Sequence, residues 1–199
     1  HGDFVLSACD NLVTSQDVER MLAAWKISPR PNGVLSLLQV PLTQISKTGI
    51  VELDGEWVTR IVEKPSVDQA PSDIASIPLY IFSMKILDYL REVPLSSRGE
   101  YELQDAIQLL IARQGFVCGV RVFSRLTVTN AVDLLAINRH FLVNERPIRV
   151  VAAGVDTDWR PPVYVEDGTL VGAHCTIGPE VFIERDCKIG DGVNLARCV

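Results

Sequence analysis

Residues 163–199 read VYVEDG TLVGAH CTIGPE VFIERD CKIGDG VNLARC V and repeat with a period of six residues. The third position of every hexad is a large aliphatic residue: Val165, Val171, Ile177, Ile183, Ile189 and Leu195. Such a period, with small residues at the corners, is typical of a hexapeptide β-helix, in which inward-pointing aliphatic side chains stack into one apolar column. Three hexads form one triangular coil of this architecture, so this stretch predicts about two coils.

The composition of the whole chain predicts one α/β domain with a small appendage. The chain has 199 residues, of which 47% are hydrophobic and 22% charged, which excludes a largely disordered protein. A net charge of −6 and the absence of a Lys/Arg cluster argue against nucleic-acid binding. The longest apolar stretch, residues 74–87, is too short to cross a bilayer, so no membrane partner is expected. Five cysteines without a CxxC pair favour a reducing cytoplasm.

The pattern before the hexads predicts strands and helices in alternation. Residues 4–9 read as a short buried strand, and Thr14 or Ser15 can cap the helix that follows. Residues 33–40 form a second buried strand, an order that predicts a parallel sheet. We therefore expect an α/β sheet domain over 1–145, a linker over 146–162, and an incomplete β-helix over 163–199. The expected linker carries Pro147, Pro161 and Pro162.

A hairpin and two further helices complete the predicted sheet domain. The runs 50–53 and 57–62 flank Asp54-Gly55, a strong signal for a tight β-hairpin. A helix is expected to carry Leu103, Ala106, Ile107, Leu110 and Ile111 on one face and to end before Gly115. Asn130, with Asp133 three residues later, predicts the start of another helix that runs to about Val143.

Three places in the chain could carry chemistry. Asp10 follows the first strand, where a carboxylate is suited to hold Mg²⁺ against phosphate oxygens, although Asp10-Asn11 could equally serve to turn the chain. Lys64 could meet a sugar phosphate while Glu63 meets hydroxyls; taken alone, the two form a solvated charge pair. His174 lies in a hexad and is a candidate base for acyl transfer, against the alternative of a merely structural histidine.

Taken together, the motifs resemble those of a known enzyme family. Asp10-Asn11, the runs GIVELDG (49–55) and IVEKP (61–65), and RGEYELQDAI (98–107) resemble the sugar-1-phosphate nucleotidyltransferases, such as glucose-1-phosphate thymidylyl- and uridylyltransferases. The resemblance implies a Rossmann-like nucleotidyltransferase sheet followed by a left-handed parallel β-helix. It also implies a reaction in which a sugar-1-phosphate attacks the α-phosphorus of a nucleoside triphosphate, forming an NDP-sugar and releasing pyrophosphate.

The resemblance assigns roles to individual residues. Asp10 would bind Mg²⁺, Glu63 would accept sugar hydroxyls, Lys64 would hold the sugar phosphate, and Gly49 would bring the backbone close to the sugar. Asp10 and Lys64 are thus the expected catalytic residues. The partners implied are the two substrates and further copies of the chain, associated through the β-helix.

The sequence departs from the family pattern at several positions. Thr127 stands where the family has a second metal-binding Asp, and the nearby Asn130 could substitute only without a charge. Pro78 and Asp73 replace residues next to the sugar, and Asp73 adds a negative charge there. The glycine-rich nucleotide loop has no counterpart, which predicts a C-terminal part of the catalytic domain that is inactive on its own.

These departures leave the activity open. Asp10 and an intact Glu63-Lys64-Pro65 favour an active nucleotidyltransferase, whereas Thr127 and Pro78 favour a regulatory or scaffold subunit that has lost turnover. A bifunctional protein whose complete β-helix transfers acyl groups is a third alternative. The sequence identifies neither the base nor the sugar.

Overall fold

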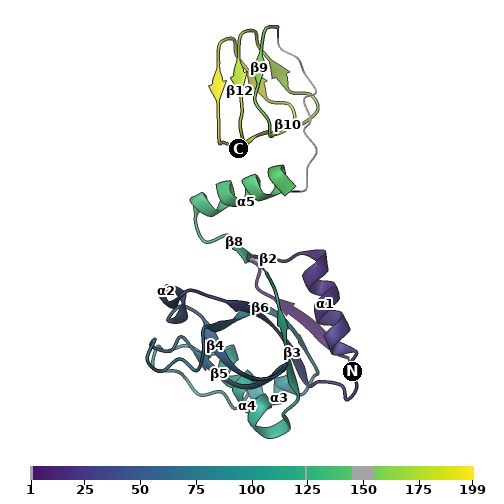
Figure 1. The fold of residues 1–199 in the computed structure, drawn as a ribbon, viewed down its shortest axis with the longest axis vertical. Helices are drawn as coiled ribbons and strands as arrows, with labels where there is room; N and C mark the ends of the chain where they lie inside the picture. The colour runs from purple at the N-terminus through teal and green to yellow at the C-terminus, as the bar shows by residue number, and fades with distance from the viewer. Residues whose placement is uncertain (1, 124, 145–154) are drawn as a thin grey trace. The chain divides into compact units, whose positions relative to one another are not determined.

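The computed structural model describes residues 2–123, 125–144 and 155–199 (Figure 1). Its internal contacts divide the chain into two compact units, a sheet unit (His1–Thr127) and a coil unit (Val128–Val199). The division falls earlier than the predicted domain end at residue 145, and much of the predicted linker lies outside the described residues. In the described part of the chain, no helix is long and apolar enough to cross a membrane.

The sheet unit consists of eight strands and four helices within its described residues. In chain order these are β1 (Phe4–Ser7), β2 (Asn11–Leu12), α1 (Ser15–Trp25), β3 (Gly33–Gln39), α2 (Leu42–Ile45), β4 (Gly49–Asp54), β5 (Trp57–Glu63), β6 (Ile74–Phe82), α3 (Ile86–Leu90), α4 (Leu103–Gln114), β7 (Val117–Arg121) and β8 (Leu126–Thr127). The Thr14 hydroxyl accepts a hydrogen bond from the Asp17 amide, so Thr14, one of the two predicted caps, caps α1.

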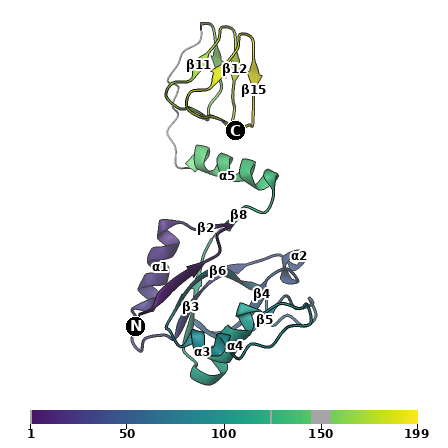
Figure 2. The same cartoon turned by 180° about the vertical axis from the view of Figure 1, so that it is seen from behind.

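The main sheet is mixed and strongly curved. Its strand order is β1-β6-β3-β7-β5-β4, and a further pairing of β4 with β6 closes a ring of five strands (Figures 1 and 2). Among the described strands of this sheet only β3 and β7 pair in parallel, so the prediction of a parallel sheet was wrong. The prediction that residues 4–9 form a buried strand was also wrong, because β1 pairs only with β6 and its side chains alternate between half-buried and exposed.

Pro78 lies at an irregularity in the longest strand. Along one edge of β6, Ala75 pairs with β4, whereas the residues from Leu79 onward pair with β1. On the other edge, the register with β3 shifts at this point, because Leu35 pairs with Tyr80 and the next residue of β3 pairs with Ile77. Proline has no amide hydrogen for a ladder bond, so it is tolerated at such a bulge. Pro78 thus marks the place where β6 changes partners.

Helices cover the two faces of this sheet. Val34, Leu79 and Ile81 form one cluster with Met21 and Trp25 of α1. Side chains of the opposite face pack with α3 and α4 in the larger cluster, which includes Leu35, Leu37, Tyr80, Phe82, Ile107 and Leu110. Alternate residues of β3 and β6 therefore enter opposite cores, as the two-residue period of a strand requires. The helical face predicted for residues 103–111 is confirmed by this packing.

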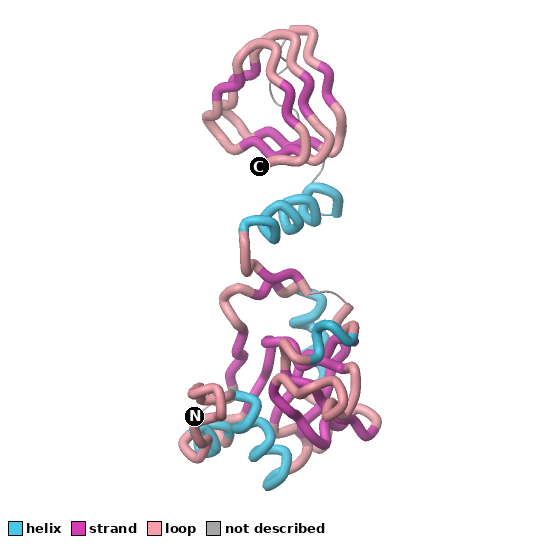
Figure 3. Tube along the Cα trace, turned by 90° about the vertical axis from the view of Figure 1, so that its left-hand side faces the viewer, coloured by secondary structure: helices cyan, strands magenta, loops and turns pink. Residues whose placement is uncertain are grey.

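The coil unit begins with α5 (Ala131–Asn144), within one residue of the predicted end of that helix. Seven short strands follow: β9 (Asp158–Trp159), β10 (Val163–Val165), β11 (Leu170–Val171), β12 (Thr176–Ile177), β13 (Val181–Ile183), β14 (Lys188–Ile189) and β15 (Asn194–Leu195). They pair in parallel with strands 18 positions along the chain: Val163 with Val181, Leu170 with Lys188, Thr176 with Asn194. Three hexads therefore make one turn of the coil (Figure 3).

The hexad period governs the interior and the corners of this coil. The inward aliphatic residues, together with Cys175 and Val181, form one apolar cluster. At the corners, a positive φ recurs every six residues, at Gly168, His174, Glu180, Asp186 and Gly192. His174, the candidate acyl-transfer base, is one of these corner residues. Its imidazole is exposed and lies 3.9 Å from the Asp156 carboxylate.

Candidate functional site

The β4–β5 hairpin places Glu63 and Lys64 at its open end. The predicted hairpin is confirmed: β4 and β5 pair from Gly49↔Glu63 to Asp54↔Trp57, and Gly55 in the turn has a φ of +60°. Lys64 directly follows Glu63, the last residue of β5. It adopts a φ of +44°, a conformation that is unfavourable for a residue with a side chain. Its amide donates to the Thr48 carbonyl at 3.1 Å, which holds this bend against the start of β4.

Glu63 is a largely buried carboxylate between two cations. Its side chain is only 12% exposed, and Oε1 lies 3.6 Å from both Lys64 Nζ and Arg98 Nη2. The other oxygen, Oε2, is buried and has no hydrogen-bond partner among the described residues. Burial raises the pKa of Glu63, while the charges of Lys64 and Arg98 act to lower it. A buried, unpartnered acceptor is costly, and a ligand hydroxyl that donated to it would remove that cost.

Gly49 gives this carboxylate its space. A Cβ at this position would lie 3.1 Å from Glu63 Oε2 and 3.0 Å from Gln104 Cγ, so any side chain would crowd both groups. The structure thus explains the glycine through Glu63 and α4. The predicted approach of the Gly49 backbone to a sugar stays a prediction.

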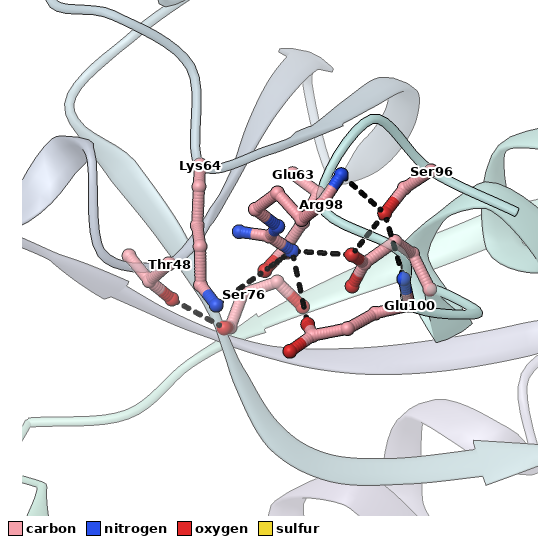
Figure 4. Close-up of polar contacts among 8 residues, drawn as sticks. Thr48, Glu63, Lys64, Ser76, Ser96, Arg98 and Glu100 are labelled. Atoms are coloured by element: carbon pink, nitrogen blue, oxygen red, sulfur yellow. Dashed lines mark hydrogen bonds and ion pairs between the residues drawn. The ribbon is translucent and has the colours of Figure 1, made fainter.

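A loop before α4 brings Arg98 to Glu63 (Figure 4). The Arg98 guanidinium forms ion pairs with Glu63, with Glu100 at 3.7 Å, and with Glu102 through a hydrogen bond. Ser96 Oγ donates to Glu102 Oε1 at 3.0 Å and accepts from the amides of Arg98 and Glu100. Sequence reasoning quoted this run as a motif but assigned Arg98 and Glu102 no role. The available signal was the charge pattern of this run, in which one Arg is followed by a glycine and two Glu residues.

Ser76 and Tyr80 of β6 form a buried pair of hydroxyl groups. The Thr48 hydroxyl donates to the Ser76 carbonyl at 3.4 Å, and Ser76 Oγ donates to the Tyr80 hydroxyl at 3.2 Å. Burial raises the pKa of Tyr80 to about 12, and the negative charge of Glu63 acts in the same direction. Tyr80 is therefore neutral at physiological pH and supports the site without adding charge.

Asp10 lies apart from these contacts, at an exposed turn between β1 and β2. The next residue, Asn11, pairs with Thr127 across the β2–β8 ribbon. The structure therefore brings Thr127 next to the Asp10 segment; that Thr127 stands in place of a second metal-binding Asp stays a prediction. Asn11 is buried, and its Oδ1 has no hydrogen-bond partner among the described residues.

The remaining two predicted site residues have other contacts. Asn130 Oδ1 accepts from the amides of Val132 and Asp133 at 2.8 and 3.3 Å, so its side-chain oxygen caps α5. Asp73 lies just before β6, where its carboxylate accepts from Gln39 Nε2 at 2.7 Å. The proposed metal role of Asn130 and the proposed sugar contact of Asp73 stay predictions.

Comparison with known proteins decides the family. The family model described as "Nucleotidyl transferase" matches residues 1–121, more than half of the chain and nearly all of the sheet unit. The chain belongs to the nucleotidyl transferase family. The match includes Asp10, the β4–β5 hairpin with Glu63 and Lys64, and the loop with Arg98.

Individual nucleotidyl transferases match different shares of this chain. The glucose-1-phosphate thymidylyltransferase of Streptomyces griseus is 29% identical over 95% of this chain, and the chain spans 57% of that protein. The UTP–glucose-1-phosphate uridylyltransferase of Haemophilus influenzae is 37% identical over 38% of this chain, and the chain spans 28% of that relative. The chain thus spans about half or less of these curated relatives.

Solved structures of nucleotidyl transferases share the fold. A UTP-bound UGPase from Acinetobacter baumannii superposes with a TM-score of 0.59 and 25% identity, over 73% of this chain and 52% of that one. A UDP-glucose pyrophosphorylase complexed with UDP-glucose gives a TM-score of 0.58 at 22% identity, over 66% of this chain and 52% of that one.

The predicted Mg²⁺ raises the question of which residues could hold a metal ion. Within the described ranges, no group of three or more His, Cys, Asp or Glu side chains is arranged to hold an ion. Mg²⁺ is usually held by one or two carboxylates together with substrate phosphates rather than by a complete protein cage. A single exposed carboxylate, that of Asp10, fits this kind of binding.

Proposed function

We propose that the chain is part of a sugar-1-phosphate nucleotidyltransferase, which forms an NDP-sugar and pyrophosphate from a nucleoside triphosphate and a sugar-1-phosphate. The observation that carries the proposal is the Glu63 carboxylate, buried between the cations Lys64 and Arg98, with one oxygen that has no hydrogen-bond partner in the described part of the chain. Family membership and the printed names of the relatives support the same activity.

The geometry suggests a role for each group in the cluster. Lys64 and Arg98 would hold the sugar phosphate through charge-assisted hydrogen bonds, and Glu63 Oε2 would accept a hydrogen bond from a sugar hydroxyl. The phosphate would then be oriented for its oxygen to bond to the α-phosphorus while the bond to pyrophosphate breaks. This step transfers no proton, so it needs positioning and charge neutralisation rather than a general base.

Asp10 is the residue proposed to hold Mg²⁺. The ion, when bound, would neutralise charge on the triphosphate oxygens. Asp10 is exposed in the turn between β1 and β2, so its carboxylate can reach a ligand without breaking a buried contact.

The test is pyrophosphate release by the full-length protein with glucose 1-phosphate and either dTTP or UTP. Lys64→Ala should raise the KM for the sugar phosphate about tenfold or more, because a charge-assisted contact to phosphate is lost. Lys26→Ala, at an exposed lysine just after α1, is the matched control and should leave the KM unchanged. Equal KM values for wild type and Lys64→Ala would contradict the assignment.

A regulatory subunit without turnover is the second candidate. The observation that favours it is Thr127, which pairs with Asn11 beside Asp10 and offers no carboxylate for a second metal contact. In this case the full-length protein would bind glucose 1-phosphate without releasing pyrophosphate. Mg²⁺-dependent turnover that appears only in Thr127→Asp would then show that the metal site had been lost by substitution.

We further propose that the hexad coil is a left-handed β-helix through which the chain associates with copies of itself. Its 18-residue turn supports the assignment, and the coil has an apolar hollow lined by Cys187, Ile189, Leu195 and Val199, among others. Sedimentation of the full-length protein at tens of micromolar tests the association, and a monomer would contradict it. A cytoplasmic location is part of the proposal, supported by five free cysteines.

A further inference from the structure

The cluster around Glu63 holds more carboxylates than cations. The cations Lys64 and Arg98 lie beside three carboxylates, those of Glu63, Glu100 and Glu102. A sugar phosphate adds further negative charge. Its binding would be opposed by this excess unless one carboxylate withdrew from the cations.

The two carboxylates on the Arg98 loop are held very differently. Glu102 is 10% exposed and accepts hydrogen bonds from both Arg98 and Ser96. Glu100 is 64% exposed, and its carboxylate lies 3.7 Å from Arg98 Nη2. A hydrogen-bonded pair that is shielded from water is strong, whereas an exposed ion pair without short contacts contributes little. Glu100 is therefore the group that can leave at small cost.

Ser96 holds the loop in a conformation in which Glu102 is fixed and the Glu100 side chain can move. Its hydroxyl oxygen accepts from the amides of Arg98 and Glu100, both at 3.3 Å, while its hydrogen is donated to Glu102. The backbone of the loop is thus tied to the Glu102 carboxylate. The Glu100 side chain can then swing into water without moving the Arg98 backbone.

We infer that Glu102 is a positioning residue that holds the Arg98 guanidinium beside Glu63, whereas Glu100 is a displaceable partner that leaves Arg98 when a sugar phosphate binds. The inference rests on the proposed function of the cluster. It has an unusual consequence: neutralising two glutamates only two positions apart changes sugar-phosphate affinity in opposite directions.

Calorimetric titration of glucose 1-phosphate into the full-length protein tests this consequence. Glu102→Gln should weaken binding about tenfold, because Arg98 loses its charged anchor. Glu100→Gln should tighten binding about two- to fivefold, because a competitor for Arg98 is removed. Nucleotide affinity should stay the same in both variants. Damage to the fold alone cannot produce the tighter binding expected of Glu100→Gln.

Two further variants guard against misfolding of Glu102→Gln. Ser96→Ala removes one hydrogen bond to Glu102, keeps every charge, and should weaken glucose 1-phosphate binding about threefold. Glu102→Asp keeps the charge and should recover part of the affinity lost in Glu102→Gln. Tighter binding in both glutamine variants, or weaker binding in both, would overturn the inference.

The outcomes separate this inference from the proposed function. A wild-type protein that does not bind glucose 1-phosphate, or one whose affinity is unchanged by Lys64→Ala, contradicts the proposed function and the inference with it. A large loss in Lys64→Ala, combined with changes of the same sign in Glu100→Gln and Glu102→Gln, contradicts the inference alone.

Discussion

The hexad coil and the Glu63 cluster obtain their neighbours in different ways. In the coil, the partner of each strand residue lies 18 positions along the chain, as Val163 and Val181 illustrate. In the cluster, Glu63 pairs with Gly49 of the neighbouring strand. It also forms an ion pair with Arg98, which lies 35 positions later in the sequence, on the loop before α4. In a repeat, a single sequence separation therefore determines which residues pack together. A binding site instead depends on several unrelated sequence separations.

The largest effect is expected at the centre of the coil. Ile177→Ala should reduce local stability by roughly 2–5 kcal/mol, because the side chain is fully buried and the neighbouring coils can fill the cavity only in part. Leu170→Ala removes a similar side chain that is mostly exposed, and should change stability by less than about 0.5 kcal/mol. Hydrogen exchange of the amides in residues 169–195 measures both. Equal effects would show that the period does not set the interior.

The corners of the coil give a second, smaller contrast. Gly178 has a φ of +109°, and a Cβ there would overlap the Arg160 carbonyl of the preceding turn. Gly178→Ala should therefore cost about 2 kcal/mol. Gly190 follows an aliphatic residue in the same way, but its added Cβ would meet no atom within 4 Å. If Gly190→Ala destabilises the same amides as strongly, the distinction between the two glycines is wrong.

In the sheet unit, a comparable test concerns one buried hydrogen bond. Tyr80→Phe should cost about 1 kcal/mol, because it leaves the buried Ser76 hydroxyl without its acceptor. The double variant Tyr80→Phe/Ser76→Ala should recover part of this loss, since neither partner is then left unpaired. Urea denaturation of the three proteins provides the comparison. A double variant less stable than the sum of the single changes would argue against a direct pair.

The smallest effect is a pH dependence caused by Glu63. Burial raises its pKa above the ordinary value of 4.5, so the folded state holds this proton more tightly than the unfolded state does. The resulting stabilisation is complete below pH 4.5 and is lost as the pH rises through the folded-state pKa. Glu63→Gln should therefore be more stable than wild type at pH 7, with a difference that shrinks on acidification.

The control for this prediction is Glu56→Gln, at an exposed position in the hairpin turn. Urea denaturation across this pH range compares both variants with wild type. A Glu63→Gln protein that is less stable than wild type at pH 7 would mean that the ion pairs of Glu63 outweigh its burial.

The same difference between the regions explains what the sequence could predict. Local signals identified the capped helix α1, the hairpin around Asp54-Gly55 and the buried face of α4, because each depends on residues a few positions apart. The mixed sheet was missed because nothing local shows that β6 lies between β1 and β3, or that Pro78 falls where its partners change. Glu63 and Lys64 were found through adjacent residues. Arg98 and Glu102 were not, since their role depends on a contact that the chain makes only when folded.

Lys64 and Arg98 are proposed to hold a sugar phosphate beside Glu63. The decisive test is a crystal structure of the full-length protein with glucose 1-phosphate. We predict phosphate oxygens within about 3 Å of Lys64 Nζ and of the Arg98 guanidinium, a sugar hydroxyl donating to Glu63 Oε2, and Glu100 turned into solvent. A phosphate bound elsewhere, with the Glu63 cluster unchanged, would contradict the claim.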